Sequence, residues 1–413
     1  MNHLFYGDNL EVLQKHIDDE SIDLCYVDPP FNSNRNYNQI YTNVGNDDIA
    51  QSQAFVDTWE WDESSELQLD LLRKEPRYTR RLVDTIFSLE KVLSKGAMLA
   101  YLVPMAIRFA EIWCVLKPTG SFFVHCDSTA SHYIKIILDA IFCDRGGKFN
   151  NEIIWRRHYS HNDGRKLGCI HDTIFYYTKS KHYTYHRQYF GYDADYIAKH
   201  YNKQDECGRR FRSVSMNAAG QGKPRYFGEK LLSPPQGTHW RWKQERINKA
   251  LDEGKIFFTP KGVPRYKQFL DEIQGVPVQD IWTDFYSLSL HDKERLGYAT
   301  QKPLALLERI IKLSSNEGDT VLDAFCGSGT TVAAAHSLGR KWIGIDNSPN
   351  AVLLIIQRLV DCYGKNILDE IVIAGIPFNL LEIFDGTTMT LPMAAAVAEL
   401  AEKHNLAKTV RTV

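Results

Sequence analysis

Four consecutive residues near the N-terminus could do chemistry together. They are Asp28, Pro29, Pro30 and Phe31, and they follow residues 23–27, a mostly apolar segment with the length of a buried strand. The prolines have no N–H and fix φ, so the backbone after the carboxylate is stiff and its carbonyls stay free as acceptors. In open α/β sheets, ligands bind at the carboxyl ends of the strands, which is where these residues would lie. A carboxylate, a free carbonyl and an aromatic ring placed there suit a flat ligand with an amino group. The competing interpretation is an ordinary proline turn.

A second stretch with a similar layout lies far along the chain. Residues 320–330 read T-V-L-D-A-F-C-G-S-G-T and predict a strand, a glycine turn and the start of a helix. Gly327 and Gly329 would allow close backbone approach to a ligand and leave helix N–H groups pointing at it. Asp346 ends the next predicted strand, where a carboxylate can accept hydrogen bonds from both hydroxyls of a ribose.

The spacing within the glycine turn limits which ligand could bind. The dinucleotide fingerprint has a third glycine where this chain has Val332, so NAD fits poorly. A P-loop has a lysine where this chain has Thr330. A turn with two glycines and no phosphate clamp suits a ribose-bearing ligand without a pyrophosphate, and S-adenosylmethionine is one such ligand.

The elements around both stretches alternate between strands and helices, which predicts an α/β fold with a parallel sheet covered on both sides. Residues 32–70, with their alternating asparagines, are interpreted as a long loop over the site. The helical pattern over 76–116 is expected to break near Gly96 and Pro104, and residues 117–120 to form a turn. The other expected strands are residues 3–6, 121–126, 151–155, 173–178 and 341–345, and the other expected helices are 9–16, 131–142, 303–313, 349–360 and 392–404.

The overall composition limits the class of protein. A chain of 413 residues with 44% hydrophobic and 24% charged residues is typical of a soluble globular protein with one large or two medium domains. The eight cysteines include no C-x-x-C pair, so no metal site is expected and reduced thiols in a cytosol fit better. The absence of a signal-peptide pattern and of a long uninterrupted apolar run predicts a cytoplasmic protein without a membrane partner.

The net charge of −2 hides an uneven distribution. Residues 151–270 contain 23 Lys and Arg against 11 Asp and Glu, whereas the rest of the chain contains 26 against 40. Between about 179 and 297, tyrosines, basic residues and glycine turns interleave, as a nucleic-acid surface requires. Arg241 in G-T-H-W-R-W-K, and Arg265 and Lys267 in G-V-P-R-Y-K, are the DNA-binding candidates. The alternative is a basic domain whose charges are solvated and whose rings form its core.

Four motifs together resemble those of the DNA amino-methyltransferases, which modify the exocyclic amine of adenine or cytosine. They are D-P-P-F at 28–31, T-Q-K-P at 300–303, D-A-F-C-G-S-G-T-T at 323–331 and I-G-I-D at 343–346. Their order, with the catalytic motif first and the cofactor motif after a target-recognition region, is similar to that of the β group. The resemblance covers roughly residues 1–178 and 299–362, and Ala324 departs from it because the family usually has proline there.

The resemblance implies a circularly permuted, doubly wound Rossmann-like methyltransferase sheet with an inserted target-recognition region. The catalytic half is expected at residues 1–178, the DNA-binding region at 179–298, the cofactor-binding half at 299–362 and a C-terminal extension at 363–413.

The resemblance also implies roles for single residues. Asp28, Pro29, Pro30 and Phe31 would form the catalytic loop, and the cofactor S-adenosylmethionine would be bound by Asp8, Thr300, Lys302, Asp323, Phe325, Gly327, Gly329 and Asp346. Among these, Asp8 would lie by the adenine of the cofactor, Thr300 and Lys302 by its carboxylate, and Asp346 by its ribose hydroxyls.

These expectations describe a site-specific DNA methyltransferase that flips its target base out of the duplex. Adenine N6 is favoured over cytosine N4, because the cytosine enzymes more often carry Ser in place of the acid at Asp28; N4-cytosine methylation stays open as the alternative. Double-stranded DNA is the expected partner, and a cognate restriction endonuclease and a homodimer are open hypotheses. The expected location is the nucleoid of a bacterial-type cell.

Three rival functions are disfavoured by particular features. RNA and protein-glutamine methyltransferases usually carry a comparable loop after the cofactor motif, and the order here is the reverse. A catalytically inactive DNA-binding subunit with this fold is disfavoured by the intact Asp28 and Asp346. A nucleotide-binding oxidoreductase is disfavoured by Val332.

Overall fold

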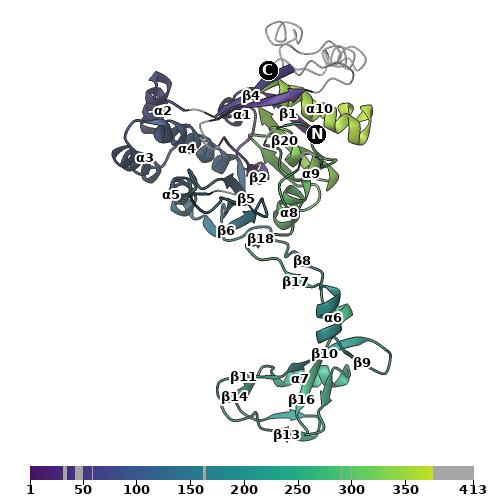
Figure 1. Cartoon of the computed structure of the whole chain (residues 1–413). Coiled ribbons are helices and arrows are strands. Elements are labelled where there is room, and N and C mark those ends of the chain that lie inside the picture. Colours follow the sequence, from purple (N-terminus) through teal and green to yellow (C-terminus); the bar gives the residue numbers. More distant parts are fainter. Residues whose placement is uncertain are drawn as a thin grey trace. The chain divides into compact units, whose positions relative to one another are not determined.

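The computed structural model describes residues 1–30, 35–41, 50–57, 59–160, 164–289, 291–298 and 300–374. They form two compact units, coloured along the sequence in Figure 1. The first, here called the sheet unit, joins residues 1–186 to the described residues from 279 onward. The second, the middle unit, comprises residues 187–278. The middle unit is shorter at both ends than the predicted DNA-binding region of 179–298.

The sheet unit is organised around nine strands in the order β18-β6-β7-β5-β2-β19-β20-β1-β21. Strand β7 is antiparallel to both of its neighbours, β5 and β6, and every other neighbouring pair is parallel, which gives a mixed α/β sheet. The strands are β1 (Asn2–Tyr6), β2 (Ile22–Val27), β5 (Leu116–Cys126), β6 (Lys148–Arg156), β7 (His171–Thr178), β18 (Ile281–Trp282), β19 (Thr320–Asp323), β20 (Lys341–Asp346) and β21 (Ile371–Ala374).

Helices cover both faces of this sheet, as the alternation of strands and helices predicts. Alternate residues of the central strands, such as Cys25, Val27, Phe122 and Val124, are buried in one core together with α1 to α5. The helices α8, α9 and α10 lie on the other side of the strands (Figure 1). The helices are α1 (Asn9–Lys15), α2 (Glu63–Lys74), α3 (Arg80–Leu93), α4 (Ala97–Val115), α5 (Ser131–Phe142), α8 (Leu304–Ser314), α9 (Thr330–Ser337) and α10 (Pro349–Tyr363), with 3-10 turns η1 (Cys143–Arg145) and η3 (Lys365–Glu370).

Helix α4 is the most buried helix of this core. By length and composition alone it could cross a membrane, but 78% of its apolar window is buried inside the fold, and it packs against α1, α2, α3 and α5. The expected break at Pro104 is wrong, because the helix continues through it. Proline removes one backbone hydrogen bond, and packing on all sides of α4 offsets that loss.

Two further expectations about local structure are wrong. The predicted loop over 32–70 contains an antiparallel pair, β3 (Arg35–Tyr41) with β4 (Ala50–Asp57), and the first part of α2. Helix α2 begins where the Asp62 side chain accepts a hydrogen bond from the backbone N–H of Ser65 at 2.8 Å, a capping signal that the polar composition masked.

The predicted turn at 117–120 lies inside β5. Ile22 pairs with Leu116 whereas Leu24 pairs with Ser121, so the extra residues form an irregularity in the strand. A Cβ on Gly120 would lie 2.9 Å from a backbone oxygen, which explains the glycine there. The predicted helix over 392–404 lies outside the described residues.

The middle unit has short strands and a small core. A four-stranded sheet in the order β15-β16-β10-β9 is joined by the two-stranded ribbons β11–β14 and β12–β13. The core beneath α7 contains Met216, Phe227, Trp240, Ile247, Ala250 and Ile256. Strands β8 (Tyr189–Phe190) and β17 (Val276–Pro277) pair where the unit begins and ends. The other elements are α6 (Ala194–His200), β9 (Lys203–Gln204), β10 (Arg210–Ser215), β11 (Asn217–Ala219), β12 (Arg225–Phe227), β13 (Lys230–Leu232), β14 (Thr238–Trp240), α7 (Gln244–Asp252), β15 (Ile256–Phe258), β16 (Pro264–Phe269) and η2 (Leu270–Glu272).

Candidate active site

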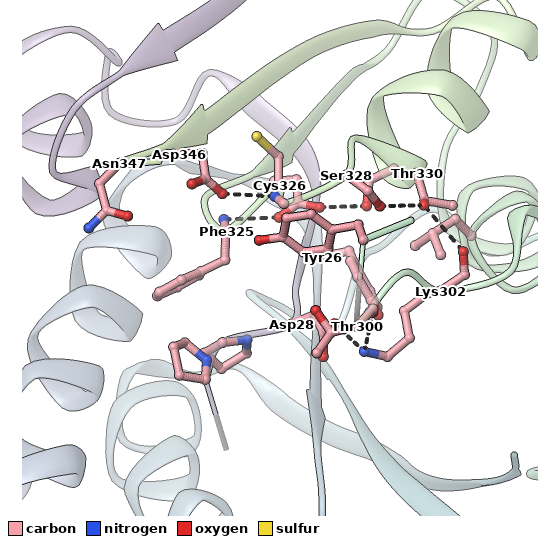
Figure 2. A pocket seen from close by; sticks show the side chains of 17 residues that line it. Tyr26, Asp28, Thr300, Lys302, Phe325, Cys326, Ser328, Thr330, Asp346 and Asn347 are labelled. Atoms are coloured by element: carbon pink, nitrogen blue, oxygen red, sulfur yellow. Dashed lines mark hydrogen bonds and ion pairs between the residues drawn. The ribbon is translucent and has the colours of Figure 1, made fainter. Parts of the chain in front are cut away.

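A cavity of about 790 Å³, including space open to solvent, lies at the carboxyl ends of β2, β19 and β20. Strands β2 and β19 are parallel neighbours, so the D-P-P segment and the glycine turn come together from distant parts of the chain. The lining residues are Tyr26, Asp28, Pro29, Pro30, Tyr298, Thr300, Lys302, Leu307, Asp323, Phe325, Cys326, Gly327, Ser328, Thr330, Thr331, Asp346 and Asn347, shown as sticks in Figure 2.

The two carboxylate oxygens of Asp28 have different surroundings. Its Oδ2 accepts a hydrogen bond from the ammonium of Lys302, and both side chains are largely buried (Figure 2). Its Oδ1 is buried and has no hydrogen-bond partner among the described residues. A buried carboxylate oxygen without a partner is costly, so this atom is positioned to accept a hydrogen bond from a ligand.

Lys302 lies between the D-P-P segment and the glycine turn. Its ammonium donates to Asp28 and to the backbone oxygen of Thr300 at 3.3 Å, while its own backbone oxygen accepts from Thr330 Oγ1 at 3.2 Å. The sequence analysis predicted that Lys302 lies near the carboxylate of the cofactor. In the structure, Lys302 forms an ion pair with Asp28 of the predicted catalytic loop. The lysine therefore connects the two halves of the cavity.

The two glycines of the turn do different things. Gly327 lines the cavity with φ +47°, and its N–H donates to Asp346 Oδ2 at 2.8 Å. Gly329 does not line the cavity: with φ +71°, a Cβ there would lie 2.5 Å from Ile355 Cγ1 of α10. Position 329 requires glycine because α9 packs closely on α10 there and because the backbone is left-handed.

Beside the turn, Asp323 is buried and Asp346 is half-buried, and desolvation raises the pKa of each carboxyl group. The pKa of Asp323 rises to about 7, although its carboxylate accepts hydrogen bonds from Thr331 Oγ1 at 2.5 Å and from the N–H of Phe325 at 3.0 Å. The pKa of Asp346 rises to about 6, against hydrogen bonds from the N–H groups of Ser348 and Gly327, both at 2.8 Å. Acidic side chains on one cavity favour a ligand with positive charge and hydroxyl donors.

Two of the predicted site residues, Asp8 and Gly329, do not line the cavity. Asp8 is half exposed, caps α1 by accepting from the N–H of Leu10 at 2.9 Å, and forms an ion pair with Arg108 at 2.6 Å. Its neighbour Asn9 instead donates to the backbone oxygen of Ala324 at 2.7 Å and so supports the turn. Phe31 lies outside the described residues.

A buried polar chain behind the cavity was missed by the sequence analysis. The Tyr26 hydroxyl lies 2.9 Å from His125 Nδ1, and His125 Nε2 lies 3.1 Å from Asp172 Oδ2. Burial on its own would raise the pKa of Asp172. The hydrogen bond from His125 and the positive charges of His125 and Arg157 have a larger opposite effect, so the pKa of Asp172 is lowered overall. The available signal was that His125 and Asp172 lie in apolar strands, where buried polar groups require partners.

The DNA-binding candidates of the middle unit differ in their surroundings. Arg241 is exposed, and its Nε donates to the backbone oxygen of Asn217 at 3.0 Å. Arg265 is half-buried and donates to Ser213 twice, at 3.0 and 3.1 Å, so it joins β16 to β10. Lys267 is half-buried with its ammonium 5.7 Å from the centre of the Phe211 ring.

Comparison with known proteins gives the class of the chain. The family model for DNA methylase of the N6/N4 type matches residues 22–357. The chain therefore belongs to the DNA methylase family. That membership supports the prediction of a methyltransferase that uses S-adenosylmethionine and is related to restriction-modification enzymes.

Particular relatives are similar over different shares of the chain. The type II methyltransferase M.EcaI of Enterobacter cloacae is 34% identical over 261 residues, 63% of this chain and 57% of that protein, so the chain spans little more than half of this relative. The DNA adenine methyltransferase YhdJ of Escherichia coli K12 is 24% identical over 358 residues, 86% of this chain and 82% of YhdJ. The solved M1.HpyAVI–SAM complex is 17% identical with a TM-score of 0.40 and covers 87% of this chain and 99% of that one.

Proposed function

We propose that this protein transfers a methyl group from S-adenosylmethionine to the exocyclic N6 of adenine in duplex DNA. The observation that carries the proposal is the unpartnered, buried Oδ1 of Asp28 in a cavity shared with the glycine turn. Family membership supports the reaction class, and the lining of the cavity supports the choice of residues.

Asp28 and the carbonyl of Pro29 would accept the two N–H bonds of the target amine. The amine is a poor nucleophile, since its lone pair is delocalised into the ring. Hydrogen bonds to both N–H groups favour a more tetrahedral nitrogen, and the negative charge of Asp28 stabilises the positive charge that develops there. The ion pair with Lys302 holds the Asp28 carboxylate at the wall of the cavity.

The cavity fits the cofactor in three respects. Asp346 is half-buried beside the turn and lines the cavity, where it can accept hydrogen bonds from ribose hydroxyls. Gly327 leaves open backbone at the cavity wall, and a Cβ there would approach the Tyr298 ring at 3.3 Å. Thr300 and Lys302 also line the cavity, and their hydroxyl and ammonium are the groups proposed to lie by the cofactor carboxylate. When bound, S-adenosylmethionine supplies a methyl group that its sulfonium already activates.

Adenine is the preferred target on two grounds. The acid in D-P-P-F is typical of the adenine enzymes in the resemblance, and YhdJ, similar along 86% of this chain, is a DNA adenine methyltransferase. N4-cytosine methylation is the alternative, because an acid and a carbonyl would bind the cytosine amine equally well. Either base would have to leave the duplex to reach the cavity, at a cost of about a few kcal/mol.

The other parts of the proposal concern the architecture. The strand order, with β1 and β2 preceding β19 and β20, supports a circularly permuted methyltransferase sheet. The middle unit is proposed as the target-recognition region, supported by its excess of 17 basic over 10 acidic residues between 187 and 278. An inactive DNA-binding subunit is the alternative from another class.

The test is incubation of the protein with genomic DNA and labelled S-adenosylmethionine, followed by mass spectrometry of the nucleosides and sequencing of the modified sites. N6-methyladenine at a defined sequence is expected, and none should form with Asp28→Ala. N4-methylcytosine would replace the adenine assignment. Tight DNA binding without any methylated base would favour the inactive subunit.

A further inference from the structure

Arg358, on α10, is a buried cation behind the glycine turn. Only 8% of this residue is exposed, and it does not line the cavity. Its Nη1 donates to the backbone oxygen of Ser328 and to Thr330 Oγ1, both at 3.2 Å. Ser328 and Thr330 do line the cavity. The guanidinium therefore contacts two residues of the cavity wall from outside the cavity.

The positive charge of Arg358 is not neutralised by an ion pair. Both of its acceptors are uncharged, and no carboxylate of the described residues pairs with it. A guanidinium keeps its proton in proteins, and a buried charge without an opposite partner is costly. The charge of Glu294 acts on Arg358, but the Glu294 carboxylate accepts a hydrogen bond from the N–H of Leu304 at 3.3 Å. The field of Arg358 therefore remains available to an anionic group in the cavity.

The surroundings of Arg358 give the cavity a positive side and a negative side. Helix α9 begins at Thr330, and its N-cap, Gly329, has no side chain to accept from the first N–H groups of the helix. Lys302 adds an ammonium beside Thr330, although its ion pair with Asp28 balances that charge. Figure 2 shows Asp346 toward the other side of the cavity. Among these cations, the buried arginine is therefore the one whose charge is not balanced.

We propose that Arg358 is a positioning residue that orients S-adenosylmethionine, because its buried charge makes the side of the cavity at Ser328 and Thr330 attractive to the carboxylate of the cofactor. The inference rests on the proposed function. Arg358 acts through its field and through the two groups that it holds, without contacting the cofactor itself. The ribose is proposed to bind at Asp346, so a carboxylate attracted to the opposite side leaves one orientation for the methionine part between them.

The test uses two ligands that differ only in the carboxylate. S-adenosylhomocysteine has it, and 5′-S-(3-aminopropyl)-5′-thioadenosine is the same molecule without it. Calorimetry measures the affinity of both ligands for the unmodified protein, for Arg358→Gln and for Arg358→Lys. Glutamine can still donate a hydrogen bond but has no charge, whereas lysine keeps the charge and loses the planar fork of donors. Thermal unfolding of each variant, measured alongside, reports its stability.

The chain offers a matched control just beyond the C-terminal end of α9. Arg340 is half-buried and donates to uncharged acceptors, namely the backbone oxygens of Leu338 at 2.6 Å and Ser315 at 2.8 Å and the Oγ of Ser315 at 3.1 Å. It does not line the cavity. Arg340→Gln therefore removes an arginine with similar partners from the opposite end of the same helix.

Arg358→Gln is expected to weaken the binding of S-adenosylhomocysteine about 10-fold, because the carboxylate loses a nearby positive charge. The affinity for the aminopropyl analogue should stay the same or rise, since its ammonium no longer meets that charge. Arg358→Lys should keep the ratio of the two affinities within about 2-fold of that of the unmodified protein. Arg340→Gln should leave both affinities unchanged.

An equal loss of affinity for both ligands in Arg358→Gln, or no loss for either, would overturn the inference. The unmodified protein should itself bind S-adenosylhomocysteine about 10-fold more tightly than the analogue. Equal affinities there would also overturn the inference, even if Arg358→Gln fails to fold. In these cases the proposed function stands, because the protein still binds the ligands. If the unmodified protein binds neither ligand, the proposed function fails together with the inference.

Discussion

The sheet unit and the middle unit differ in how they hold their charged side chains. In the sheet unit, Asp28, Asp323 and Asp346 stand at the carboxyl ends of β2, β19 and β20 over a large core and are buried or half-buried. In the middle unit the strands have two to six residues, the core is small, and Arg241 is exposed. A rigid scaffold suits chemistry that depends on small displacements, whereas an exposed, loop-rich surface suits contact with a long polyanion. Variants in the two units should therefore change different measured quantities.

The largest effect is expected for Asp28→Asn. Loss of the charge that stabilises the transition state should lower turnover on the order of 10²-fold or more, with little change in cofactor affinity. Single-turnover methylation and calorimetry with S-adenosylmethionine measure the two quantities. Full activity of this variant would contradict the role given to Asp28 and leave the sheet unit without a catalytic acid.

Asp346→Ala should act on cofactor affinity. Removal of charge-assisted hydrogen bonds to ribose is expected to weaken S-adenosylmethionine binding by roughly 1–3 kcal/mol. Its matched control is Asp8→Ala, because Asp8 lies outside the cavity and caps α1. Calorimetry measures the affinity of both variants for S-adenosylmethionine. An equal loss of affinity in both, or no loss in Asp346→Ala, would mean that the ribose does not bind at Asp346.

Asp323 should make stability depend on pH. Its pKa of about 7 in the folded protein lies above the ordinary value of 3.8, so the folded state binds more protons than the unfolded state between these values. The free energy of unfolding should therefore fall as pH rises from about 4 to 7, by up to about 1.4 kcal/mol per pH unit from this group. In Asp323→Asn this contribution is absent, and denaturant titrations of both proteins at pH 5 and pH 8 should show a smaller pH difference for the variant. An unchanged pH difference would mean that Asp323 titrates normally.

The smallest effects are expected in the middle unit and should leave cofactor binding untouched. Arg241→Ser should weaken DNA binding, either equally for all sequences with a flatter salt slope or by roughly 1–3 kcal/mol at one position of the site. Arg265→Ser removes two hydrogen bonds to Ser213 and should also lower the stability of this unit by about 1 kcal/mol. Titration of cognate and scrambled duplexes, with thermal unfolding alongside, separates the two roles. If both variants bind every duplex as the unmodified protein does, the recognition surface lies outside these loops.

Local patterns predicted much of the sheet unit. The D-P-P segment and the glycine turn each follow a short apolar strand, and their meeting in one cavity follows from the parallel pairing of β2 with β19. The polar segment 32–70 was mistaken for a loop, because composition conceals both the β3–β4 pair and the cap of α2. Pro104 was mistaken for a helix end, because the packing that surrounds α4 is not visible in the residues next to the proline.

Contacts between residues far apart in the sequence could not be predicted from such patterns. Lys302 and Asp28 are 274 positions apart, and His125 and Asp172 are 47 apart. Which lysine meets which acid depends on strand register and on side-chain packing, and neither leaves a periodic signal in the chain. The role of Gly329 shows the same limit, since the crowding by Ile355 becomes visible only once α9 and α10 are packed together.

Because β8 pairs with β17, the first and last residues of the middle unit lie next to each other in space. The N–H of Val278 also donates to the backbone oxygen of Gln188 at 2.9 Å, which closes the same ribbon. A segment whose two ends are neighbours can be replaced by another of different length without stretching the flanking chain. Under the proposed function, recombination at this ribbon would exchange the target-recognition region and keep the residues that line the cavity.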